Sequence, residues 1–436
     1  MKEKSIILKN ILKILSNFLP YGVIESWDDL NPNLYVSVHI YWLKFYGMWF
    51  NNYSWKTIKF WIQILYTFII FWLVCLLPGI GEIYYLLQRR ENISHIAEGL
   101  YLFLSEMYTY FKIFVFWYNK EKIMNLLNYI HCKEFEPQEP EHKIIIKKTI
   151  KMARFVMNAY TLMCVGAVTV AILMPLTENF EILPTNVEYP YINVYTSPAY
   201  SIIYLHHVYY KPATCIIDGV MDTILAAFIA STLGQIEILS FNLLNFDMLA
   251  ERHHKRVYQK YKITSYVFKK MCVKNVLKKC IIHHNAIIRY VSMIEDAFSL
   301  ASALQFMLSA MVLCLVGVQF LSIENPSSHC MQIMWMAVYL TCMLTEVFIL
   351  CWFGNELILK SLELQNVAFA CPWLGTNLNN KLFIIILMER SKRPLQVTAG
   401  KIFTLSLNTY TNLINWSYKA FAVMRNMKNN VVMFEE

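Results

Sequence analysis

Long apolar runs dominate the pattern of hydrophobic and polar positions along this chain of 436 residues. Three windows, residues 60–80, 155–177 and 297–323, contain no Asp, Glu, Lys or Arg. About 20 consecutive apolar residues let a helix cross the hydrocarbon core of a bilayer, whereas the core of a soluble domain needs no such run. The pattern therefore predicts an all-α, polytopic membrane protein.

Charged breaks between the apolar runs divide the chain into seven candidate transmembrane spans. We place them at residues 58–84, 93–118, 152–176, 199–245, 281–323, 330–360 and 394–426. Spans four to six are longer than a bilayer requires, because a helix rises about 1.5 Å per residue and the hydrocarbon core is about 30 Å thick. We expect these helices to continue into the cytosol and to form an anchor bundle with residues 361–393, within a single domain that covers residues 1–436.

The loops between the spans alternate sharply in charge. Residues 177–197 hold three Glu and no Lys or Arg, whereas residues 247–279 hold ten Lys and Arg against two acids. Because Lys and Arg accumulate in cytosolic loops, the basic loop is expected inside the cell and the acidic loop outside. Carried along seven spans, this alternation predicts a cytosolic N-terminus and an extracellular C-terminus.

Composition supports the membrane assignment. The chain is 57% hydrophobic, 15% aromatic and 16% charged, whereas soluble domains carry about 25% charged residues. Its formal net charge of +9 is distributed in the way that membrane topology requires. We therefore expect contact with membrane lipid and none with nucleic acid.

No motif in the chain predicts catalysis, a metal or a cofactor. Adjacent histidines on a helix point about 100° apart and cannot chelate together in the way that i, i+4 histidines do. The 11 cysteines lie mostly in apolar runs without zinc-type spacing, so we expect reduced thiols. Asn92 begins a glycosylation sequon in the first external loop. The histidine pairs that we interpret as packing residues are His206 with His207, His253 with His254, and His283 with His284.

Three carboxylates fall inside predicted spans. Asp218 and Asp222 are one helical turn apart on the fourth span, and Glu346 lies in the sixth. Carboxylates at membrane depth are costly and normally face protein or water, which makes them functional candidates. The alternative is a hydrogen-bonded structural acid, or one close to the cytosolic end of a long span; both interpretations stay open.

Aromatic and polar side chains gather in the outer halves of the fourth and sixth spans. A cavity with such walls suits a small, mostly apolar molecule, although the same residues could serve helix packing or an interfacial aromatic belt. The candidate ligand-binding residues are Tyr200, Tyr204, His207, Gln332, Trp335, Met336 and Tyr339.

The last span carries a polar stripe at helical spacing. Facing lipid, such a stripe would be expensive; facing a water-filled path, it is natural. One helix cannot enclose a pore, so a pore made by this stripe implies several subunits around an axis; polar contacts between helices are the alternative. The residues of the stripe are Thr409, Asn412, Trp416, Lys419, Val423 and Asn426.

The C-terminal third of the chain resembles the insect odorant receptor family. Several patterns that occur in a fixed order support the resemblance: Cys351-Trp352-Phe353-Gly354-Asn355-Glu356-Leu357, Ser361, Cys371-Pro372-Trp373, Met388 to Leu395 (MERSKRPL), Val397 to Phe403, Leu405-Ser406-Leu407, Ser417-Tyr418 and Phe421. The second cytosolic loop is shorter than that of the family's co-receptor, which favours an odorant-tuning subunit.

The resemblance implies a non-selective cation channel that small volatile odorants open. It implies a heterotetramer with the odorant receptor co-receptor in the plasma membrane of sensory neuron dendrites, with the odorant bound among spans two to six. The family's gate positions match Val423 and Met427, with Asn426 between them. A homomeric channel like the gustatory receptors and a metabotropic seven-helix receptor are the alternatives.

Overall fold

The computed structural model describes residues 32–49, 56–89, 93–177, 180, 182–261, 266–322 and 330–435. The predicted glycosylation position Asn92 lies outside these residues. The side chains of Asn426 and Met427 also lie outside the described side chains, although the helix that carries them is described.

Helices form nearly all of the described chain. They follow the apolar runs of the sequence, and one short hairpin interrupts them near the C-terminus. The elements are η2 (Pro32–Tyr35), α2 (Ser37–Phe45), α3 (Ile58–Phe71), η3 (Trp72–Leu76), α4 (Leu77–Gln88), α5 (Ile93–Tyr118), α6 (Lys120–Tyr129), η4 (Lys133–Phe135), α7 (Pro140–Thr177), α8 (Ala199–Leu244), α9 (Phe246–Tyr261), α10 (Tyr266–Ser322), α11 (Cys330–Ala370), α12 (Leu378–Ser391), β1 (Thr398–Ala399), β2 (Phe403–Thr404) and α13 (Leu407–Glu435).

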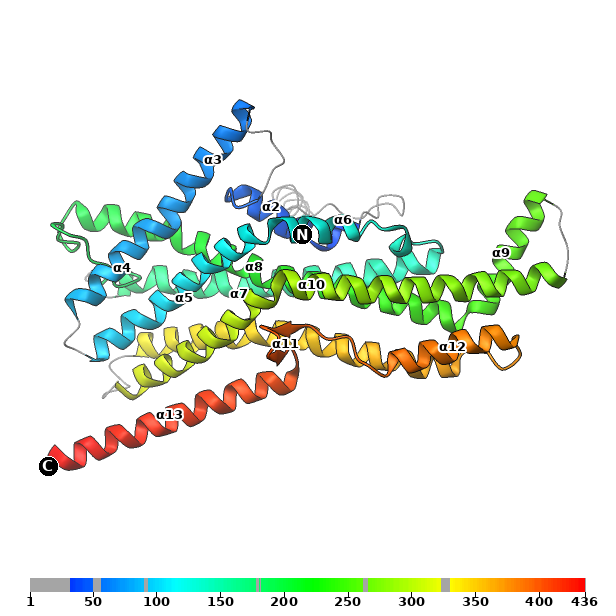
Figure 1. The fold of residues 1–436 in the computed structure, drawn as a ribbon. Helices are drawn as coiled ribbons and strands as arrows, with labels where there is room; N and C mark the ends of the chain where they lie inside the picture. The colour runs from blue at the N-terminus through cyan, green and yellow to red at the C-terminus, as the bar shows by residue number, and fades with distance from the viewer. Residues whose placement is uncertain are drawn as a thin grey trace, which may run out of the picture.

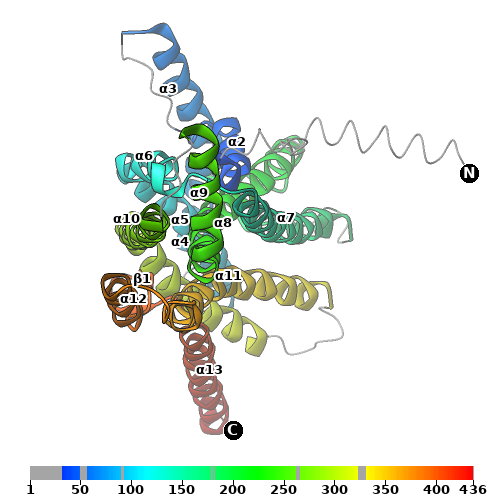
Figure 2. The same ribbon diagram turned by 90° about the vertical axis from the view of Figure 1, so that its right-hand side faces the viewer.

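Helix α8 is the axis of an elongated bundle. In its most apolar stretch 83% of the residues are buried within the chain, against 17% to 33% in the other four helices that are apolar enough to span a membrane. Helices α7, α10 and α11 run beside it, while α3 and α13 diverge from the bundle on opposite sides (Figures 1 and 2). The chain is therefore a polytopic all-α membrane protein with a core built around α8.

Five helical segments have the length and apolar composition of a membrane span: Ile58–Gln88, Pro140–Leu176, Ala199–Leu244, Lys270–Phe320 and Met331–Ala370. The predicted second and seventh spans, α5 and α13, are long enough but are not among these five. Both contain a lysine, Lys112 in the second half of α5 and Lys419 near the middle of α13. Seven spans and the inverted topology therefore remain predictions.

Several helices extend further than the apolar runs indicate. Helix α7 begins at Pro140 rather than at residue 152, α10 begins at Tyr266 rather than at 281, and α11 continues to Ala370 rather than ending at 360. Ion pairs support these polar turns: Arg252 on α9, for example, donates to Glu141 at 2.9 Å and 3.1 Å. The spans were predicted from apolar length, which gives the bilayer-crossing part of a helix and not its ends. For α10 and α11 the longer helices are the continuation that the sequence predicted, whereas for α7 no continuation was predicted.

The last helix begins at Leu407, so the predicted span of 394–426 is wrong at its start. Strands β1 and β2 pair antiparallel, Ala399 with Phe403, and Gly400 and Lys401 adopt left-handed backbone angles of φ 63° and 59°. Such angles end a helix and suit a tight turn. The Ser406 hydroxyl then accepts the Thr409 N–H at 3.2 Å, as an N-cap does, and α13 starts.

Residues of the C-terminal motif hold this hairpin against α11. A Cβ on Gly354 would lie 2.3 Å from the carbonyl oxygen of Leu405, so only glycine lets the two backbones approach this closely. The segment just before the hairpin is also held to α11, because the Ser361 hydroxyl accepts the Leu395 N–H at 2.9 Å. The residues of the C-terminal motif thus hold α11 against the hairpin that directly precedes α13.

Candidate ligand-binding site

A cavity of about 130 Å³ lies among four helices, in the half of the bundle that adjoins the loop between α7 and α8. On α7 the lining positions recur at helical spacing and include small side chains, which leave room that larger ones would fill. The lining residues are Leu102, Ser105, Glu106 and Thr109 on α5; Tyr160, Cys164, Ala167, Val168 and Ala171 on α7; Pro184 and Thr185 in the loop; Lys211, Thr214, Cys215 and Asp218 on α8; and Trp335, Tyr339, Cys342, Met343 and Glu346 on α11.

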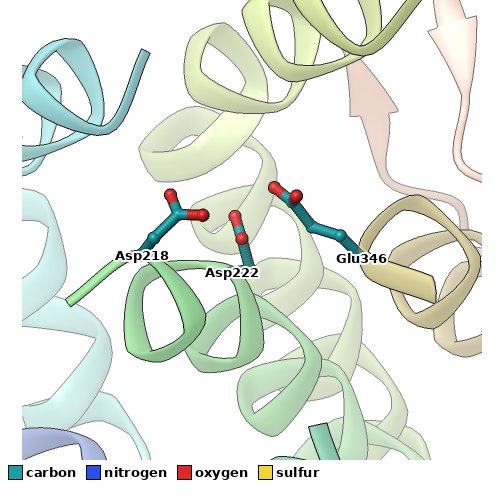
Figure 3. Close-up of side chains that lie close together, drawn as sticks. All are labelled: Asp218, Asp222 and Glu346. Carbon is teal, nitrogen blue, oxygen red and sulfur yellow. The ribbon is translucent and has the colours of Figure 1, made fainter. Parts of the chain in front are cut away.

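A buried charge cluster closes the inner end of the cavity. The three carboxylates noted in the sequence, Asp218, Asp222 and Glu346, point toward one space between α8 and α11 (Figure 3). One oxygen from each lies within 4.8 Å of the others. The ammonium nitrogen of Lys112, on α5, lies in that space at 2.8, 2.5 and 2.9 Å from the three residues respectively.

The Lys112 ammonium fills the position that a metal ion would need. An ammonium has three N–H donors, and here each carboxylate accepts one of them. Further donors support the acids: Thr109 donates to Asp218 at 3.0 Å and Gln305 donates to Glu346 at 2.6 Å. These contacts make the lysine, rather than a metal, the cation of this cluster.

A second ion pair lies on the cavity wall, closer to the loop. Lys211 on α8 is paired with Glu106 on α5, and the Tyr110 hydroxyl donates to the other Glu106 oxygen at 3.1 Å. Glu82, on α4, is 3% exposed, and neither of its carboxyl oxygens has a hydrogen-bond partner among the described residues. The cavity therefore lies between two acid-rich clusters.

Two of the seven predicted ligand residues, Trp335 and Tyr339, line the cavity. Tyr200 and Tyr204 stack on each other, and their hydroxyls donate to the carbonyls of Ile182 and Ile172, at 2.8 and 3.0 Å. Both rings pack against Phe180 in the loop between α7 and α8, and Tyr204 also joins α8 to α7.

The other three predicted ligand residues also lie away from the cavity lining. The His207 ring is fully buried, with Nδ1 2.7 Å from the Ile203 carbonyl, and Met336 belongs to a separate apolar cluster with Tyr101. Gln332 is half-buried and does not line the cavity. The aromatic character of a helix face therefore did not separate wall residues from packing residues.

The lysine of the charge cluster is the residue that the sequence reasoning missed. Lys112 is the one charged residue between Tyr108 and Trp117 in a predicted span, and the intramembrane acids required a counter-ion. Looking for that counter-ion would have found it.

The described part of α13 packs on the bundle along one face. Tyr410 contacts the Phe348 ring, Leu413 is buried, and a Cβ on Gly317 would lie 2.7 Å from the ring of Phe421. The opposite face is left exposed by this packing, including Val423 and Lys419.

The predicted pore stripe is divided by this arrangement. Lys419 and Val423 are exposed and Asn412 is half-buried. Thr409, in contrast, is half-buried and donates its hydroxyl to the Thr404 carbonyl at 2.6 Å. Trp416 contacts the Phe403 ring and is also exposed. The first turns of the stripe therefore hold the hairpin, and its later turns carry the exposed face.

Together, the long apolar helices, the cavity among four helices and the diverging last helix have the architecture of a polytopic membrane protein. The family model described as "7tm Odorant receptor" matches residues 92–418. The chain belongs to this odorant receptor family. As a member of a family of receptors and channels, it is not an enzyme.

Two Drosophila odorant receptors are similar to this chain along most of their length. The chain is 23% identical to odorant receptor 46a, isoform B, of Drosophila melanogaster, over 78% of this chain and 86% of that protein. It is 22% identical to odorant receptor 13a of the same species, over 88% and 94%. The odorant receptor coreceptor of Anopheles gambiae matches at 27% identity over only 36% of this chain and 32% of its own length. The chain is thus related to the tuning receptors and is not the co-receptor.

Solved structures show the same fold. The insect olfactory receptor OR5 from Machilis hrabei superposes with a TM-score of 0.69 at 16% identity, covering 88% of this chain and 96% of that one. The structure of OR5 in complex with eugenol gives a TM-score of 0.71 at 16% identity, covering 90% and 98%.

Proposed function

We propose that this chain is the odorant-binding subunit of a cation channel, which it forms as a heterotetramer with the odorant receptor co-receptor. The supporting observation is the cavity among α5, α7, α8 and α11, in a fold whose relative OR5 is described in complex with eugenol. The proposed location is the plasma membrane of sensory neuron dendrites, with the cavity in the outer half of the membrane.

The gate is proposed on α13, at Val423, Asn426 and Met427. An odorant can shift a closed and open equilibrium only if it binds the two states with different affinity. Helix α11 offers a route for such a difference, because it contributes Trp335, Tyr339 and Glu346 to the cavity and packs on the start of α13 through Phe348. Movement of α11 around a bound odorant would therefore reach the base of the pore helix.

Substitution in the cavity tests the odorant site. We expect Tyr339→Ala to change which odorants open the channel, because it removes an aromatic wall. Tyr204→Ala is the matched control, since Tyr204 packs against Phe180 of the loop and does not line the cavity. The measurement is the whole-cell current evoked by a panel of volatile compounds in cells that also express a co-receptor. An identical profile for Tyr339→Ala and wild type would contradict the site.

A further inference from the structure

The charges around the cavity point to a particular class of ligand, given the odorant-binding function proposed above. The two clusters hold more carboxyl groups than ammonium groups, and all of them lie inside the helical bundle. The carboxyl groups are Glu82, Glu106, Asp218, Asp222 and Glu346; the ammonium groups are Lys112 and Lys211.

Such a surplus of negative charge has to be neutralised. An isolated buried carboxylate is very costly, and neighbouring carboxylates that share one cation repel each other. The second oxygen of Asp222 shows the shortage of cations directly, because it is buried and has no hydrogen-bond partner in the described part of the chain. Protons or a cationic ligand can supply the missing positive charge.

Asp218 is the acid of the inner cluster that a ligand can reach. Its side chain is 25% exposed, against 4% for Asp222 and 2% for Glu346, and it lines the cavity. On the outer cluster, Glu106 already receives Lys211 and the Tyr110 hydroxyl on its two oxygens. A ligand in the cavity therefore meets Asp218 as its most accessible acidic group.

We propose that the cavity binds small volatile amines, with Asp218 as the group that recognises the nitrogen. A volatile amine is neutral when it arrives, and it binds a proton far more tightly than a carboxylate does. One proton held by the acid cluster passes from a carboxyl oxygen to the amine nitrogen, so that an ammonium forms beside the Asp218 carboxylate with no change in net charge. The ammonium then supplies part of the missing positive charge.

The rest of the cavity suits the remainder of such a molecule. Trp335, Tyr339 and Tyr160 supply aromatic rings, whose faces attract cations. Ala167 and Val168 on α7 supply an apolar wall for an alkyl group. A neutral molecule of the same shape would gain the apolar contacts and lose the charge pairing.

Matched ligands test this inference on the purified full-length chain in detergent. The probes are hexylamine and 1-hexanol, and the readout is the rise in Tm that each produces at a series of concentrations, because a ligand that binds the folded state stabilises it. We expect hexylamine to bind at least about tenfold more tightly, and Asp218→Asn to remove this preference by weakening hexylamine binding far more than 1-hexanol binding. Thr169→Val is the control and should keep the preference, since Thr169 is exposed on α7 and does not line the cavity.

Each outcome decides the point. Equal binding of the two probes to wild type, or a preference for hexylamine that survives Asp218→Asn, would overturn the assignment. If Asp218→Asn does not fold, the wild-type comparison and Asp218→Glu, which keeps the carboxyl group, decide instead. Selective binding of hexylamine without any odorant-evoked current would refute the proposed channel and support the amine-binding site. Currents evoked by 1-hexanol but not by hexylamine would support the channel and refute the amine-binding site.

Discussion

At the scale of single residues, the feature with the largest consequence is Lys112. Its ammonium is the shared partner of Asp218, Asp222 and Glu346, which come from two helices, while Lys112 comes from a third. Breaking a buried ion pair by removing one partner is far more damaging than replacing all partners, because an uncompensated charge remains. The lysine therefore ties α5 to α8 and α11.

Replacing this lysine should destabilise the fold strongly. For Lys112→Met we expect a loss of about 3–5 kcal/mol, measured as a lower Tm in detergent and a lower level at the cell surface. Adding Asp222→Asn and Glu346→Gln should recover much of the loss, because the remaining acid charge falls. Lys148→Met is the control: Lys148 is 72% exposed in its pair with Glu237, and such pairs contribute about 0–1 kcal/mol. Similar losses for the two lysines would contradict this account.

At the scale of elements, the sequence predicted where helices lie better than where they end. The predicted spans matched α5 at both ends and α8 to within one residue. The polar extensions of other helices, and the hairpin before α13, depend on tertiary contacts such as Arg252 with Glu141 and Gly354 with Leu405. Such contacts join residues that are far apart in the sequence, so the local pattern of apolar and polar residues does not predict them.

The same reason limited prediction of the site. The cavity combines side chains from four helices and a loop, and each helix contributes a face that also packs elsewhere. Trp335 and Tyr339 were identified because they share a helix face, but Tyr200 and Tyr204 have the same character and hold a loop instead. Intramembrane charge was the more informative signal, since Asp218 and Glu346 both line the cavity.

The junction between α11 and the hairpin gives a prediction at this scale. Gly354→Ala should destabilise the chain by about 1–3 kcal/mol, the typical cost of overpacking, because the added methyl group would meet the backbone of Leu405. Gly166→Ala is the matched control, since a Cβ there has no atom within 4 Å. The measurement is the Tm of each purified variant. Equal values for both variants would show that the hairpin is not held this closely.

At the scale of the whole molecule, α13 is the helix whose outer face no other part of the described chain covers. It leaves the bundle (Figure 1) and exposes Lys419 and Val423 on the side opposite its contacts. A closed ring of subunits would cover such faces around one axis. Four lysines at one level of a pore would repel cations, so we expect few copies of this chain in each channel, with the co-receptor completing the ring.

The most direct test of the central claim is the whole-cell current in a heterologous cell that expresses this chain with or without an insect co-receptor, under a panel of volatile compounds that includes amines. We predict odorant-evoked cation current only when both chains are present, with altered ion selectivity for Lys419→Gln. Lys392→Gln is the control, because Lys392 lies at the end of α12, away from α13, and pairs with Glu389 at 2.6 Å. Equal current from this chain alone, or current abolished by blocking G proteins, would contradict the proposed heteromeric channel.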